Sequence, residues 1–171
     1  YTRRFIVDGR PVCRALIHGQ MSTARYAARR SLFIEAGGWN ESVGVWDDLD
    51  LGLRLLSLNP AMGRVGIRNA VTVYYSEMSI TAQADSRAVS PEKEHALDCC
   101  EDTLAVSGNV CGLRWVDYRR VLLAAEYASR GDREAARRLL QKLRWAPRWV
   151  CRLLYVKHRL FSRGTYLLAP F

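Results

Sequence analysis

The stretch GGWNESVGVWDDLDLGLRLL, residues 37–56, joins a glycine-rich turn to the acidic start of a helix. It contains four carboxylates, two tryptophans and four glycines. From Trp46 onward the leucine pattern predicts a mostly buried helix that ends before Pro60. Aspartates are favourable in its first turn, because the unpaired backbone N–H groups there carry partial positive charge. Those aspartates are Asp47, Asp48 and Asp50.

The sequence on either side of this stretch predicts a mixture of strands and helices. Residues 1–17 are two apolar stretches joined by Asp8-Gly9, a pattern typical of a β-hairpin. A short helix is expected to end at Gly37-Gly38, and residues 63–75 alternate as one or two short strands do. Proline at helix starts and glycine at helix ends then predict further helices. They are expected over about 91–107, 115–129 and 133–145, and from Pro147 onward.

The net charge of +9 is concentrated in the C-terminal third of the chain. Residues 111–171 carry 14 Lys and Arg against 4 Asp and Glu, whereas residues 1–110 carry 12 against 13. Any attraction to a polyanion is therefore expected from the C-terminal third.

The composition is that of an ordinary globular protein, with 49% hydrophobic and 25% charged residues. The five cysteines form no CxxC pair and no metal-ligand spacing, which favours reduced thiols in a cytosolic compartment over disulfides. No apolar run reaches the roughly 18–20 residues that a membrane-spanning helix needs. The three histidines are remote from one another in sequence and are expected to be structural or surface residues.

Three groups of residues occur in an order that resembles a known enzyme family. They are Arg29-Arg30-Ser31-Leu32-Phe33, Gly37-Gly38-Trp39-Asn40-Glu41, and Trp46-Asp47-Asp48-Leu49-Asp50-Leu51-Gly52-Leu53-Arg54. In this respect the chain resembles the C-terminal, acceptor-side part of a family 2 glycosyltransferase. The family pattern reads RR…F…GG(F/W)(D/N)E and, after a short gap, (E/D)DxDLxLR. The resemblance covers about residues 1–110.

The resemblance implies an α/β fold, namely a partial GT-A (nucleotide-diphospho-sugar transferase-like) domain that lacks its N-terminal half and is followed by an α-helical extension. Residues 1–82 would form the acceptor-side half of that domain, residues 83–110 a connecting helix, and residues 111–171 the basic helical extension. The nucleotide-binding half, with its metal-binding Asp-x-Asp, is expected outside this chain. These residues alone are therefore expected to be inactive.

The resemblance also implies a divalent cation, Mg or Mn, in the complete enzyme, with ligands mostly outside this chain. Many members carry a histidine where this sequence has Ser76. No metal ligand is therefore assigned to these residues.

By the same resemblance, Asp48 matches the catalytic base. A base is needed because inverting glycosyl transfer requires an acceptor hydroxyl to lose its proton as its oxygen attacks the anomeric carbon. Substrate-binding roles are implied for Asp47, Trp46, Trp39, Gly38 and Arg30. Structural or donor-orienting roles are implied for Asp50, Arg54 and Ser79.

Each of these residues also has a purely structural explanation. The aspartates can cap the helix and interact with its dipole. Asp50 and Arg54 are four residues apart in a helix and are expected to pair with each other. Trp39 can pack in the core, and Arg30 can be a solvated surface residue.

These observations predict an inverting glycosyltransferase fragment of bacterial cell-surface polysaccharide synthesis. Its substrates would be a nucleotide-sugar donor and a saccharide or lipid-linked acceptor. The expected location is the cytoplasm, with peripheral contact at the inner face of the membrane.

The last helix leaves alternatives open. One face is expected to carry Trp145, Trp149, Leu153 and Leu160, with Arg148, Arg152 and Arg159 beside it, which is typical of a helix lying on an anionic membrane. Packing of that face on the rest of the protein explains the pattern equally well. The alternative function is a non-catalytic basic helical module that binds a membrane surface, nucleic acid or a protein partner. Nucleic acid is the least favoured of these, because no nucleic-acid-binding motif is present.

Overall fold

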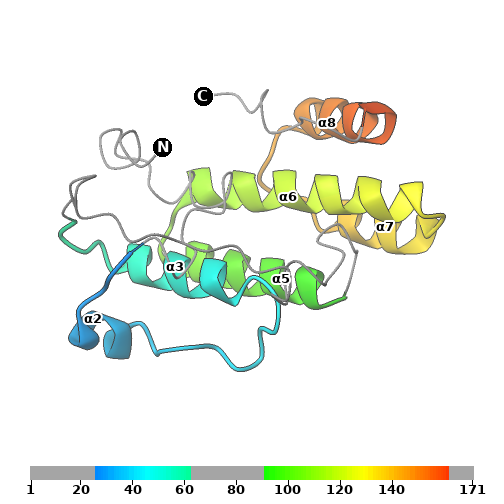
Figure 1. Cartoon of the computed structure of the whole chain (residues 1–171). Coiled ribbons are helices and arrows are strands. Elements are labelled where there is room, and N and C mark those ends of the chain that lie inside the picture. Colours follow the sequence, from blue (N-terminus) through cyan, green and yellow to red (C-terminus); the bar gives the residue numbers. More distant parts are fainter. Residues whose placement is uncertain (1–25, 63–90, 162–171) are drawn as a thin grey trace, which may run out of the picture.

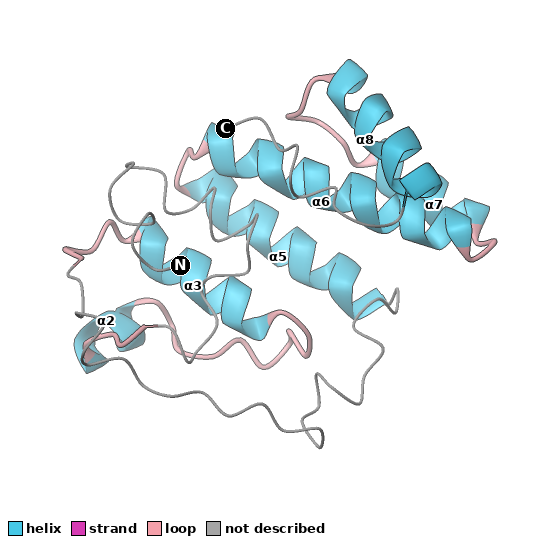
Figure 2. Ribbon diagram, turned by 45° about the horizontal axis from the view of Figure 1, so that its top comes forward, coloured by secondary structure: helices cyan, strands magenta, loops and turns pink. Residues whose placement is uncertain are grey.

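The computed structural model describes residues 26–62 and 91–161 (Figure 1). These two ranges contain six helices, and no strand is present in them (Figure 2). The helices are α2 (Arg30–Glu35), α3 (Asp47–Ser57), α5 (Pro91–Val106), α6 (Val110–Ser129), α7 (Arg133–Gln141) and α8 (Arg148–Phe161). The described part of the chain is therefore all-α.

This finding corrects the expected α/β fold, which is wrong for the described residues. In a partial GT-A domain the apolar face of α3 would pack on a sheet, whereas here it packs on another helix, α5. The strands predicted over residues 1–17 and 63–75 lie outside the described residues, as do Ser76 and Ser79. The division of the chain at residues 82 and 110 stays a prediction.

One hydrophobic core joins four of the helices. In the bundle α5 lies between α3 and α6 (Figure 2), and α7 and α8 both pack on α6. Leu53 of α3, Leu97 of α5 and Val116 of α6 are fully buried in this core, and Leu139 of α7 is almost so. Burying a leucine or valine side chain stabilises a fold by about 1.5–3 kcal/mol, so this shared core is what holds α3 in place.

Side-chain caps set the starts of α6 and α7. The side chain of Asp132 accepts a hydrogen bond from the backbone N–H of Ala135, which confirms the predicted start of α7. Gly131 before it has a φ of 94°, a conformation that favours glycine. Helix α6 begins earlier than predicted because Asn109 caps it, accepting from the backbone N–H of Gly112 at 2.9 Å.

A buried arginine organises the polar contacts of the bundle. Arg120 of α6 is only 1% exposed and lies 2.7 Å from the carboxylate of Asp98 and 2.5 Å from that of Glu101, both on α5. Asp117, one turn earlier on α6, is 3.7 Å from the same guanidinium. Three carboxylates thus surround one cation, which compensates for taking the charge out of water.

Asp117 also fixes the chain between α7 and α8. Its second carboxylate oxygen accepts hydrogen bonds from the backbone N–H groups of Arg144, Trp145 and Ala146 at 2.6–3.1 Å. These bonds form a tight loop, and α7 accordingly ends at Gln141 rather than at the predicted residue 145. Trp145 is therefore in this loop and not on the face of α8.

We expect Asp117→Ala to lower the free energy of unfolding by about 3–5 kcal/mol, because it leaves the buried Arg120 short of a partner and three backbone N–H groups without their acceptor. Asp117→Asn keeps an oxygen for those N–H groups and should cost less. Chemical denaturation would measure both. Asp102→Ala, an exposed carboxylate on α5, is the matched control and should stay within about 0.5 kcal/mol.

Candidate functional site

The turn between α2 and α3 is held by a single arginine. Arg54 of α3 donates to the backbone carbonyls of Ala36 and Gly38, the latter at 2.7 Å. It also forms the expected ion pair with Asp50, donating from Nε at 3.0 Å and Nη2 at 2.7 Å to one carboxylate oxygen. The side chain of Asp50 is 2% exposed, so this pair is largely shielded from water.

The turn itself requires glycine. Gly37 and Gly38 have φ angles of 82° and 67°, in the left-handed region that other residues rarely adopt. A Cβ at Gly38 would also lie 3.4 Å from the ring of Phe33. The two glycines therefore let the chain reverse close to α2 and direct Trp39 back over Phe33, whose ring centroid is 6.5 Å from that of Trp39.

Asp48 lies at the N-terminal end of α3, half-buried. Its carboxylate accepts from the backbone N–H of Leu49 at 2.8 Å, and the carboxylate of Asp47 accepts from the N–H of Asp48 at 2.9 Å. Burial raises the pKa of Asp48, and the neighbouring charge of Asp47 raises it further. The N–H of Leu49 and the guanidinium of Arg119 act in the opposite direction.

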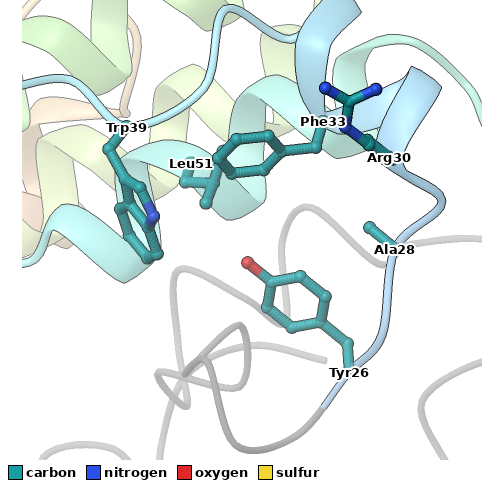
Figure 3. Close-up of a pocket in the computed structure, with 6 residues that line it drawn as sticks. All are labelled: Tyr26, Ala28, Arg30, Phe33, Trp39 and Leu51. Carbon is teal, nitrogen blue, oxygen red and sulfur yellow. The ribbon is translucent and has the colours of Figure 1, made fainter.

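A shallow hollow of about 310 Å³ lies between α2, the residues on either side of it, and α3. Figure 3 shows Tyr26, Phe33 and Trp39 arranged around it, with Arg30 at one side and Leu51 of α3 at its base. Leu51 is three residues after Asp48 and so lies on the same side of α3. The pKa of the Tyr26 hydroxyl is raised, first by burial and then by the charge of Asp48, so these two groups are within electrostatic reach of each other.

Trp46, for which the resemblance implies a substrate-binding role, is packed against the helices α5 and α6. Its backbone is left-handed, with a φ of 63°, which is costly for a bulky residue. Lys93 Nζ of α5 and the Arg119 guanidinium of α6 lie 5.7 and 5.0 Å from its ring centroid, within cation–π range. The ring also packs on the core. These contacts anchor Trp46 to the bundle rather than direct it to the hollow.

A second set of polar contacts fastens the loop before Trp46 to α5. Asn40 accepts from the N–H and hydroxyl of Ser42, and that hydroxyl is 3.2 Å from Nε2 of His95. Cys99 Sγ is 3.7 Å from the same nitrogen. Burial and then the nearby acidic groups raise the pKa of the Cys99 thiol, which keeps it protonated. A protonated thiol is a poor nucleophile, so this set is a structural tether.

The structure thus divides the predicted site residues into three groups. Arg30 and Trp39 line the hollow, Gly38 forms the turn that leads to Trp39, and Asp47 and Asp48 are at the start of α3, one turn before Leu51. Asp50, Arg54 and Trp46 hold the surrounding backbone. Ser79 is outside the described residues.

Sequence reasoning missed several residues that the structure brings to this region. They are Tyr26, Phe33, Leu51, Lys93 and Arg119. Phe33 and Leu51 belong to the quoted motifs and were identifiable as inward-facing. Lys93 and Arg119 reach the site only through the packing of α5 and α6, for which no local pattern exists.

In residues 26–62 and 91–161 no group of three or more His, Cys, Asp and Glu side chains could hold a metal ion. The same ranges contain no helix both long and apolar enough to cross a bilayer.

Comparisons of the chain with protein-family models, with curated proteins and with solved structures gave no match.

We expect Arg54→Met to lower the free energy of unfolding by about 3–5 kcal/mol, since it leaves the carboxylate of Asp50 buried and unpaired. Arg54→Lys can keep one contact but cannot bridge two carbonyls and a carboxylate together. Its free energy of unfolding should therefore lie between those of Arg54→Met and the parent. Chemical denaturation would measure the series, and Arg137→Met on an exposed part of α7 is the control. If Arg54→Met and Arg137→Met lowered the free energy of unfolding equally, Arg54 would not be what holds the turn.

The proton affinity of Asp48 should respond in opposite directions to its two charged neighbours. Asp47→Asn removes a like charge and should lower the pKa of Asp48, whereas Arg119→Met removes a cation and should raise it further. Titration of the Asp48 carboxyl by carbon-detected NMR would measure both shifts. Glu41→Gln, exposed on the same loop, should leave the pKa unchanged.

Proposed function

We propose that this chain is the acceptor-side part of an inverting, nucleotide-sugar-dependent glycosyltransferase, with Asp48 as the catalytic base. The observation that carries the proposal is a half-buried carboxylate of raised pKa, one helical turn before Leu51, which lines an open hollow together with three aromatic side chains. The resemblance of the motifs Gly37-Gly38-Trp39 and Asp47-Asp48 to family 2 glycosyltransferases supports the same reading. The proposal concerns the site alone and does not depend on an α/β fold.

The hollow suits a sugar. Pyranose rings present C–H groups on their faces and hydroxyls on their edges, so they bind well against aromatic side chains with polar groups nearby. Trp39 is 45% exposed, and its ring meets Phe33 edge to face, which leaves part of its surface open to a ligand. The Tyr26 hydroxyl and the Arg30 guanidinium provide hydrogen-bonding groups at the same hollow (Figure 3).

Asp48 would act on an acceptor hydroxyl placed in this hollow. Its carboxylate would take the hydroxyl proton as the oxygen forms a bond to the anomeric carbon of the donor sugar. The bond from that carbon to the diphosphate would break at the same time, and the nucleoside diphosphate would leave with the electron pair. A raised pKa makes a carboxylate a stronger base, which favours transfer of the hydroxyl proton to it.

The proposed substrates follow from this role. The acceptor would be a saccharide or lipid-linked saccharide of cell-surface polysaccharide synthesis, and the donor a nucleotide sugar bound mainly outside the described residues. A divalent cation on the donor diphosphate, Mg or Mn, would be held there as well. A lipid-linked acceptor would place the enzyme at the inner face of the cytoplasmic membrane.

Saccharide binding tests the hollow without requiring the donor. Saturation-transfer NMR of the chain with a panel of mono- and oligosaccharides should show contact to the sugar protons. Trp39→Ala should weaken binding roughly tenfold, as expected for loss of an aromatic contact of about 1–1.5 kcal/mol. Trp149→Ala, an exposed tryptophan on α8, is the matched control. Binding that Trp39→Ala leaves unchanged would place the ligand elsewhere.

The catalytic role needs the complete enzyme. Asp48→Asn should retain saccharide binding, because the amide can still accept from Leu49, but should lose turnover by about 10²–10⁴-fold. The same variant should be no less stable than the parent at neutral pH, since burial penalises the charged carboxylate. Full turnover in Asp48→Asn would refute the assignment of the base.

A further inference from the structure

The outer face of α8 carries an apolar stripe that no other described element covers. With about 3.6 residues per turn, Trp149, Leu153, Val156 and Leu160 line up along one side of the helix. Their exposed fractions are 72%, 65%, 54% and 69%. Four large apolar side chains that are this exposed on one helix face are uncommon on a surface that contacts only solvent.

The orientation of this stripe is fixed by the opposite face of α8. Cys151 is buried there against Tyr118 and Val121 of α6, and Leu154 packs on the same cluster. His158 lies 3.4 Å from the carboxylate of Glu126 on α6. In Figures 1 and 2 α8 lies along the outside of α6, so the stripe is directed away from the bundle.

Cations flank the stripe on both sides. The helical repeat places three exposed arginines along one edge of the stripe, namely Arg148, Arg152 and Arg159. It places Lys157 along the other edge. The helix RWVCRLLYVKHRLF contains no acidic residue. A stripe of tryptophan and aliphatic side chains between two basic edges matches the boundary between lipid headgroups and acyl chains.

We propose that α8 binds the surface of an anionic lipid bilayer, lying in the plane of the interface. The apolar stripe enters the boundary between headgroups and acyl chains. The flanking arginines and Lys157 contact the anionic headgroups with their charged ends. This binding is independent of any catalysis by Asp48. It would hold the hollow near lipid-linked molecules.

The charge pattern favours lipid over a second copy of the chain. Pairing two α8 stripes would bring arginine edges together with no carboxylate on either helix to compensate. Nucleic acid would satisfy the cations but would leave the apolar stripe in water. An anionic bilayer satisfies both parts of the face at once.

Vesicle flotation of the whole chain tests this inference. Phosphatidylcholine vesicles with and without phosphatidylglycerol provide the anionic and neutral surfaces. The chain should float with the anionic vesicles only, and less at high salt because salt screens the attraction. Each cation near such a surface contributes roughly fivefold in affinity, so Arg152→Glu/Arg159→Glu should weaken binding by more than about tenfold.

A second variant removes the apolar contact without changing charge. Trp149→Ala/Leu153→Ala should also lose flotation, because it removes two of the four large side chains of the stripe, including its tryptophan. Two control pairs match these changes away from α8. Arg133→Glu/Arg137→Glu reverses two exposed cations of α7, and Ile34→Ala/Val106→Ala trims two exposed apolar residues. Both controls should float like the parent.

Three results would overturn the proposal. One is absence of flotation by the parent chain with anionic vesicles. Another is unchanged flotation of the folded α8 variants, with folding checked by circular dichroism. The third is a parent chain that dimerises without vesicles in sedimentation velocity and becomes monomeric with Trp149→Ala/Leu153→Ala, since the stripe would then be a self-association surface.

Discussion

The ion-paired burial of Arg120 is the constraint on which the bundle depends. A guanidinium out of water is tolerated only with several carboxylates close by, and here they come from both α5 and α6. These pairs restrict how far α5 can slide along α6, which apolar packing alone would allow. Asp117 extends the same constraint, because one oxygen faces Arg120 and the other binds the loop that leads to α8. The position of α8 is therefore set from the centre of the bundle.

The candidate site uses the same construction on a smaller scale. Arg54 contacts a carboxylate on its own helix and two carbonyls of the preceding turn, so it fastens the glycine turn to α3. Because α3 is packed on α5, the turn is also fixed relative to the bundle. The aromatic hollow thus has a rigid support on the side of α3, which is what a binding site needs for defined geometry.

The parts of this structure that the sequence predicts are those with local causes. The pairing of Asp50 with Arg54 follows from helical spacing, and the start of α7 follows from Asp132 after a glycine. The α/β expectation, which is wrong for the described residues, came from the resemblance of three short motifs. The leucine pattern of α3 identifies a buried helix but not the partner on which it is buried. Contacts such as that of Arg119 with Trp46 join residues far apart in the chain, and only the packed bundle reveals them. The catalytic role of Asp48 stays a prediction.

The left-handed backbone at Trp46 has a consequence for the order in which the protein assembles. Such a conformation costs a bulky residue about 1–2 kcal/mol, and the cations that compensate come from α5 and α6, later in the chain. While the chain is being synthesised, the acidic motif would leave the ribosome well before Arg119 exists to contact it. The helix start beside Asp48 would therefore take its final shape only after α6 has been made and has docked. Maturation of the site is in this way tied to completion of the bundle.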